Sequence, residues 1–187
     1  SLTMTSASLA ALMSSPQLFR EWAPRIIARK YDHTNKPAGR KQGVTLGMGV
    51  TEKQGGTDIR TNETAAEPVG RDLYRLNGHK WFLSAPMSDA FLVVAQAKEG
   101  PSCFLAPRLR DDGRANGFHF QRLKNKLGNR SNASAEVEFK DTLAFPVGEV
   151  GAGIRTIMDM VTLTRLDCAL GSAGLMRAAL SEAVHHA

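Results

Sequence analysis

The residues best suited to hold a ligand lie in two short segments of this sequence. The first, residues 48–58, reads Met-Gly-Val-Thr-Glu-Lys-Gln-Gly-Gly-Thr-Asp and follows an apolar, strand-like lead. Glycine has no Cβ and tolerates positive φ, so the Gly-Gly pair lets backbone N–H groups approach a bound molecule beside the hydroxyls of Thr51 and Thr57. The same pattern is also typical of a turn that only joins two strands.

The second segment, Leu73–Ser84, reads as a strand, an Asn-Gly turn and a returning strand. On the returning strand, alternation predicts Phe82 and Ser84 on one face and Trp81 on the other, in the core. One face would then offer an aromatic ring and a hydroxyl to a planar ligand. Ordinary hairpin packing explains the same residues without a ligand.

Together these segments resemble the middle domain of the acyl-CoA dehydrogenase family of flavoproteins. Residues 50–58 are similar to the family's Thr/Ser-Glu-Pro-x-Ala-Gly-Ser-Asp block, and residues 77–84 to its Asn-Gly-x-Lys-x-Trp-Ile-Thr block. A third block, Lys-Leu-Gly-Asn-Arg at 126–130, precedes an alternating strand, and a fourth, at 147–154, resembles the entry into the family's C-terminal helical domain. Four blocks in order are far more specific than any one of them.

Within the family, the closest resemblance is to the alkylation-response, AidB-like branch. Residues 52–56 read Glu-Lys-Gln-Gly-Gly in place of the usual Glu-Pro-x-Ala-Gly, and residues 164–171 read Thr-Arg-Leu-Asp-Cys-Ala-Leu-Gly. Full-length family members are more than twice as long, so we expect the chain to be an internal fragment.

The resemblance implies FAD as the cofactor and a set of flavin-contacting residues. Phe82 stands where the family usually has a Trp against the isoalloxazine, and Ser84 where a Thr hydroxyl meets the flavin N5 edge. The full set of expected cofactor-binding residues is Met48, Val50, Thr51, Gly56, Thr57, Phe82, Leu83 and Ser84.

The resemblance identifies no residue of this chain as the catalytic base. In the isovaleryl-type branch the base is the Glu of a Leu-Glu-Arg motif, and the matching position here is Thr164, which cannot act as a carboxylate base. Asp167 lies three residues further on, where we expect a neighbouring helix face and an ion-pair partner such as Arg165. We therefore assign no catalytic residue and no metal ligand in this chain.

The strands and helices expected from the sequence, which must position these residues, indicate an α+β fold. Short alternating segments between Val44 and Phe145 are typical of an antiparallel β-barrel or sandwich. Incomplete helical segments flank it: Ser6–Lys30, which its prolines divide into two short helices, and Ile154–His186, one long helix. The expected domains are the end of an N-terminal helical domain with a linker at 1–43, the flavin-binding domain at 44–150, and the first helix of a truncated C-terminal helical domain at 151–187.

Composition limits the partners. The chain of 187 residues has a net charge of +6, with seven Lys and Arg against two acids in residues 1–45 and again in 101–130. Such patches suit the phosphates of nucleic acid, FAD or coenzyme A, and also serve as ordinary solubilising surface. Cys103 and Cys168 lie far apart, which favours reduced, buried thiols of a cytoplasmic protein over a disulfide or metal pair. No segment is apolar enough to span a membrane.

Two functions fit these observations. The first is an FAD-binding acyl-CoA dehydrogenase-like protein, an oxidoreductase that would carry out α,β-dehydrogenation of acyl-CoA thioesters, with weak activity and a link to the DNA alkylation response. The second is a non-catalytic flavin- and DNA-binding stress protein that protects DNA. The resemblance implies an acyl-CoA or similar small molecule as partner, double-stranded DNA bound through regions outside this chain, and a homotetramer when full length. Exposed apolar faces on the helical segments also predict self-association.

Overall fold

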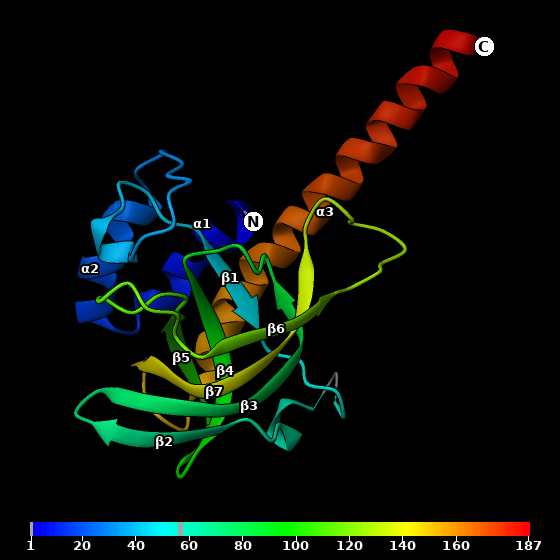
Figure 1. The fold of residues 1–187 in the computed structure, drawn as a ribbon. Helices are drawn as coiled ribbons and strands as arrows, with labels where there is room; N and C mark the ends of the chain where they lie inside the picture. Colours follow the sequence, from blue (N-terminus) through cyan, green and yellow to red (C-terminus); the bar gives the residue numbers. More distant parts are fainter. Residues whose placement is uncertain (1, 56–57) are drawn as a thin grey trace.

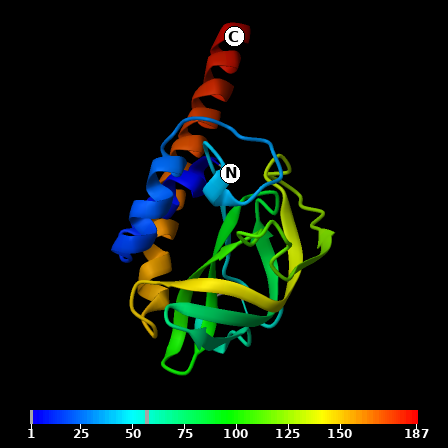
Figure 2. The same ribbon diagram turned by 60° about the vertical axis from the view of Figure 1, so that its left-hand side comes forward.

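The architecture is a curled mixed sheet with helices on one side (Figures 1 and 2). The computed structural model describes residues 2–55 and 58–187, so the predicted flavin contacts Gly56 and Thr57 lie outside the described residues. The strands are β1 (Leu46–Gly49), β2 (Ala65–Gly70), β3 (Leu73–Ser84), β4 (Ala90–Ala97), β5 (Gly100–Pro107), β6 (Phe118–Leu123) and β7 (Ser134–Val147). The helices are α1 (Leu2–Leu12), α2 (Pro16–Ile26) and α3 (Gly153–His186), with short 3-10 turns at Ala38–Arg40 and Ile59–Thr61.

The strand pairings close on themselves. The order is β1-β3-β2-β4-β5-β7-β6, and the additional pairings β1–β4 and β3–β7 complete a circuit. Most pairs are antiparallel, as predicted, but β4 runs parallel to both β1 and β2. The expected sandwich-like β fold with flanking helices is confirmed, with a mixed rather than purely antiparallel sheet.

Strand β4 separates two apolar clusters and is buried on both faces. Leu92 and Val94 face the helices, where they pack with Leu12 and Ile157 among others. The alternate residues of β4, including Phe91, lie in the interior of the curled sheet. Because both faces are buried, β4 reads as a continuous apolar run rather than an alternating one.

The two predicted N-terminal helices are present, but only Pro16 separates them, and Pro24 lies inside α2. Pro16 lies at the start of α2, where a missing N–H costs nothing, so the proline separates α2 from α1. Helix α3 runs through its whole predicted span, and its first turns are anchored by the buried Ile157 and Met160. Residues 165–187 of the helix are exposed, and its C-terminal part projects away from the sheet (Figure 1).

The predicted Asn77-Gly78 turn is wrong. Strand β3 runs through both residues, and the hairpin turn lies between β2 and β3 instead. Gly78 has φ of +145° at a register shift against β7, and a Cβ there would lie 2.6 Å from Thr64 Cα. The Asn77 side chain accepts a hydrogen bond from Asp141 N at 2.9 Å. The pair therefore forms a β-bulge with a close backbone approach, which needs glycine for the same φ reason as a turn.

Among the residues that the structure describes, no helix has both the length and the apolar character needed to cross a bilayer. Both cysteines are free thiols, but only Cys103 is buried and Cys168 is exposed. The prediction of two buried thiols is therefore wrong for Cys168, because it lies in the exposed stretch of α3, residues 165–187.

Candidate functional site

Pairing of β1 with β3 brings the two predicted ligand segments together. Met48 lies opposite Ser84 and Gly49 opposite Leu83, and Trp81 N donates a hydrogen bond to Thr51 O at 2.9 Å. The strands approach so closely that a Cβ on Gly47, the residue before Met48, would lie 2.3 Å from Ser84 O. The glycines of this segment thus allow the contact between strands, in addition to any role at a ligand.

Three groups at this junction are free to meet a ligand. The Phe82 side chain is 41% exposed, so part of its ring is accessible to a ligand. Within residues 2–55 and 58–187, the half-buried Thr51 and Ser84 hydroxyls make no hydrogen bond to the protein. An open aromatic ring beside two unsatisfied hydroxyls fits a planar, polar-edged group such as the flavin of FAD.

The side chains of three other predicted flavin-binding residues pack within the protein itself. Leu83 is fully buried inside the sheet, so only its backbone is available to a ligand. Met48 and Val50 are half-buried and pack against the helix-side cluster. These residues therefore support the junction more than they face outwards.

Trp81 does not lie in the core as predicted. A register shift between Lys80 and Leu83 breaks the alternation of β3, so Lys80 and Leu83 are buried instead. Lys124 Nζ lies 3.2 Å from the centre of the Trp81 ring and 4.6 Å from that of Phe82. Both rings thus meet one ammonium group, a cation–π arrangement that holds positive charge beside the junction.

Glu136 neutralises part of this charge. Its carboxylate accepts hydrogen bonds from Lys124 Nζ at 2.7 Å and from Arg122 Nε at 2.8 Å. These hydrogen bonds, first of all that from Lys124, hold the pKa of Glu136 below its ordinary value. The ion pairs fix the position of Lys124 over the two rings.

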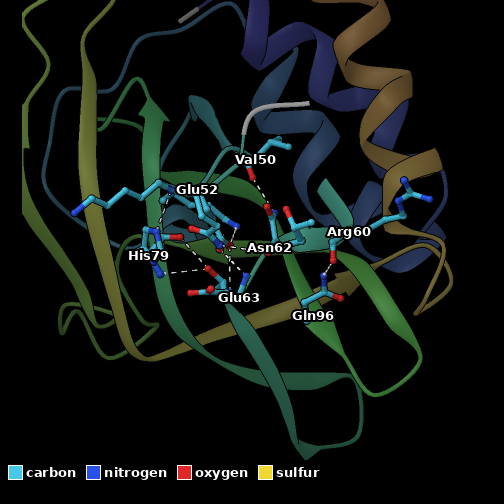
Figure 3. A network of polar contacts seen from close by, with 12 residues as sticks. Val50, Glu52, Arg60, Asn62, Glu63, His79 and Gln96 are labelled. Carbon is cyan, nitrogen blue, oxygen red and sulfur yellow. Dashed lines mark hydrogen bonds and ion pairs between the residues drawn. The ribbon is translucent and has the colours of Figure 1, made fainter. Parts of the chain in front are cut away.

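A fully buried ion pair joins Glu52 and Lys80, which follow Thr51 and precede Trp81 in the sequence, and the sequence analysis did not predict it. Glu52 and Lys80 pair with both side chains 0% exposed (Figure 3). The Glu52 carboxylate also accepts from Glu63 N at 2.6 Å, Thr64 N at 3.2 Å and Gln54 Nε2 at 2.9 Å. These donors, together with Lys80, satisfy the oxygen atoms of the Glu52 carboxylate.

The surroundings of the pair set its protonation. Burial opposes ionisation of Glu52, but the Lys80 ammonium and the hydrogen-bond donors outweigh it and lower the pKa to about 2. Burial lowers the pKa of Lys80 to about 8, against the opposing attraction of Glu52. Both groups are therefore charged at neutral pH.

Further hydrogen bonds tie the chain around Glu52 to the sheet (Figure 3). Asn62 Nδ2 donates to Val50 O at 3.0 Å, and Lys53 N donates to His79 Nε2 at 3.1 Å. Gln96 Nε2 donates to Arg60 O at 2.9 Å. The segment that carries Thr51 is consequently held on both sides, which preorganises its hydroxyl and backbone groups.

A cavity of about 290 Å³ opens beside Met48. Its wall includes Asn129 and Asn132 from the loop after β6, and Thr164, Asp167 and Cys168 from α3. Thr164 and Asp167 therefore line the same cavity, which is compatible with the expected neighbouring faces of the helix. Residues three apart on a helix are neighbours on its surface. Among the described residues, Asp167 forms no ion pair with Arg165 either.

The comparisons with known proteins agree with this geometry. Residues 47–142 match the acyl-CoA dehydrogenase middle domain, and residues 1–33 match the adaptive response protein AidB N-terminal domain. The chain therefore belongs to the acyl-CoA dehydrogenase family.

Within that family the chain is most similar to the AidB branch. It is 50% identical over 187 residues to AidB of Escherichia coli (strain K12), an alignment that covers 100% of this chain and 35% of that protein. It is 36% identical over 148 residues to acyl-CoA dehydrogenase family member 11 of Caenorhabditis elegans, covering 73% of this chain and 24% of that protein.

A solved structure supports the same assignment. The crystal structure of Caenorhabditis elegans ACDH-11 in complex with C11-CoA superposes with a TM-score of 0.80 at 30% identity, covering 95% of this chain and 31% of that one. The chain thus spans about a third of the length of AidB and of ACDH-11.

Proposed function

We propose that this chain forms the flavin-binding part of an FAD-dependent acyl-CoA dehydrogenase-like protein. The observation that carries the proposal is the junction of β1 and β3, where Met48 lies opposite Ser84 beside the exposed ring of Phe82. Family membership supplies the chemistry that this junction would serve.

Each residue of the junction has a distinct part in this proposal. The Phe82 ring would pack against the flavin, while the Thr51 and Ser84 hydroxyls would hydrogen-bond its polar edge. When bound, FAD supplies an acceptor for a hydride from an acyl thioester. Lys124, held 4.6 Å from the Phe82 ring, would bring a positive charge near the flavin and so favour electron uptake.

The test is reduction of the flavin by an acyl-CoA. The protein, expressed from its full reading frame, is mixed anaerobically with butyryl-CoA while the visible absorbance of its flavin is followed. Loss of the oxidised-flavin band, with formation of the unsaturated thioester, supports the proposal. A flavin-loaded protein that no acyl-CoA of any chain length reduces contradicts the dehydrogenase activity.

We further propose a link to the alkylation response, in a cytoplasmic homotetramer. Support comes from the match of residues 1–33 to the adaptive response protein AidB N-terminal domain and from 50% identity to AidB. Weak turnover would be compatible with such a role, in which double-stranded DNA is bound through regions outside this chain. Salt-dependent binding of duplex DNA by the full-length protein is expected, whereas this chain alone should bind weakly. Light scattering of the full-length protein tests the assembly.

A further inference from the structure

We propose that the cavity between the linker after α2 and the turn after β3 binds a small organic acid through its carboxylate, with Arg108 as the group that holds the charge. None of the predicted flavin-binding residues that the structure describes lines this cavity. The inference is therefore independent of the proposed function.

The cavity lies where three parts of the chain meet, and its volume is about 230 Å³. Its wall includes the linker residues Tyr31–Asn35 and Lys41, Met87 and Asp89 of the turn between β3 and β4, and Arg108 just after β5. Sites for drug-sized ligands usually enclose about 300–1,000 Å³, so this cavity suits a smaller molecule.

A buried ion pair joins two of these parts. Lys41 Nζ lies 2.7 Å from Asp89 Oδ1, and the two side chains are only 4% and 6% exposed. Lys41 Nζ also donates to Asp32 O at 3.0 Å, and Thr45 N donates to Asp89 Oδ2 at 2.9 Å. The charges of Lys41 and Asp89 are therefore matched within the wall, and these bonds preform the cavity.

The second carboxylate of the wall is engaged as well. Asp32 accepts hydrogen bonds from Thr34 N at 3.0 Å and from the Thr34 hydroxyl. These bonds, first of all that from the hydroxyl, lower the pKa of Asp32 to about 2, so this carboxylate is charged at neutral pH. Lys36 Nζ, 3.7 Å away, supplies the matching positive charge.

Arg108 brings a further positive charge to the wall. Its Nε donates to Ser88 O at 2.9 Å and its backbone N to Asp89 O at 2.8 Å, which hold the half-buried side chain in place. In the part of the chain that the structure describes, Arg108 takes part in no ion pair and its Nη atoms donate no hydrogen bond. Those donors form a planar fork that matches a carboxylate.

The charge of the wall favours a carboxylate over a phosphate. Because Asp89 and Asp32 each have a partner, Arg108 leaves one positive charge for a ligand. A carboxylate carries one negative charge at neutral pH, whereas a phosphate monoester carries about 1.5 to 2. A phosphate would thus bring surplus negative charge close to two carboxylates.

The rest of the ligand should be apolar. Met87 and Tyr31 are 57% and 79% exposed, so two large side chains of the wall are open to an apolar group. Benzoate combines one carboxylate with a small apolar ring and serves as the probe.

Calorimetric titration of the full-length protein tests the proposal. Sodium benzoate is compared with benzamide, which has the same ring but no charge, and with inorganic phosphate. We expect saturable binding of benzoate, and binding at least about 10-fold weaker for benzamide and in Arg108→Gln, because a hydrogen-bonded charge is lost. Arg110→Gln is the matched control: Arg110 is also half-buried, lies outside the wall and donates to Asn116 Oδ1 at 3.3 Å.

A second variant keeps the test decisive if Arg108→Gln fails to fold. Tyr31→Ala removes part of the apolar wall and should weaken binding of benzoate. Met13→Ala changes an exposed side chain outside the cavity and should leave binding unchanged. Circular dichroism is measured for every variant.

Wild-type protein that shows no saturable binding of benzoate, or that binds benzamide equally well, would overturn the assignment. So would unchanged affinity in a folded Arg108→Gln or in Tyr31→Ala, because benzoate would then bind elsewhere. Tighter binding of inorganic phosphate than of benzoate would overturn the choice of a carboxylate. The FAD content of the same samples reports separately on the proposed function.

Discussion

Removing one member of the buried Glu52–Lys80 pair should destabilise the protein strongly. In Glu52→Gln the Lys80 side chain loses its carboxylate partner in a site where both side chains are 0% exposed, and burying an unpaired ammonium or giving up its proton costs free energy in either case. Loss of one partner from a buried pair typically costs about 3–5 kcal/mol. At about 2–4 °C per kcal/mol for a chain of this size, the midpoint of thermal unfolding should fall by about 6–20 °C.

Urea unfolding measures this loss directly. Trp22 lies in the helix-side cluster and Trp81 is next to Lys80 in β3, so fluorescence reports on both parts of the fold. Arg75→Met, which breaks the exposed Arg75–Asp141 pair, should leave the midpoint unchanged. The double variant Glu52→Gln/Lys80→Met removes both charges and should recover more than about half of the loss.

A loss below about 1 kcal/mol in Glu52→Gln would contradict this explanation, because that range belongs to exposed pairs. So would a double variant less stable than the single one, since the unpaired charge would then not be the cause.

The structure predicts three further measurable effects. Because the pKa of Glu52 is lowered to about 2, the folded protein binds fewer protons than the unfolded chain between about pH 5 and 2. The free energy of unfolding should therefore decrease as the pH falls through that window, and less steeply in Glu52→Gln. Acid titration followed by circular dichroism checks this. Burial raises the pKa of the Cys103 thiol to about 12, so a thiol reagent should label only Cys168 in the native protein and both in urea; two fast thiols in native buffer would contradict the fold around β5. Gly78→Ala should destabilise the protein by at least about 1 kcal/mol, because of the φ of +145° and the nearby backbone of Thr64. Gly171→Ala has open space around it and should add about 0.5–1 kcal/mol to the stability of α3. Equal effects of the two substitutions in urea unfolding would argue against the bulge.

The elements with a clear period were predictable from the sequence. Helix α3 has apolar residues near helical spacing and no proline, and its observed span is within a residue of the expectation. Most strands of the sheet lie at the expected positions, because Gly, Asn and Asp interrupt their alternation. The family resemblance placed residues of both segments at one flavin, but the pairing of β1 with β3 was not predicted.

Prediction from periodicity failed where strand β3 is locally irregular. Strand alternation assigns Trp81 to the core, but the register shift after Lys80 displaces the pattern and buries Leu83 instead. The glycine of an Asn-Gly pair can supply positive φ in a bulge as well as in a turn, so composition cannot separate the two. The Glu52–Lys80 pair joins residues 28 positions apart, and a lone Glu and a lone Lys in sequence give no sign that both will be buried.

Two features of the protein remain predictions. The division at residues 43 and 150 into three domains comes from the resemblance alone. FAD binding through Thr51, Phe82 and Ser84 is supported by their open groups, and Gly56 and Thr57 lie outside the described residues.

Flavin binding at the β1–β3 junction is tested most directly by the FAD content and affinity of the full-length protein, compared between Phe82→Ala and Phe120→Ala. Both rings are similarly exposed, at 41% and 44%, but only Phe82 lies at the β1–β3 junction. We predict stoichiometric FAD, identified after heat release, in the wild type and in Phe120→Ala, and markedly weaker binding in Phe82→Ala. A colourless wild type that cannot be reconstituted with FAD, or equal affinity in both variants, would contradict flavin binding at this junction.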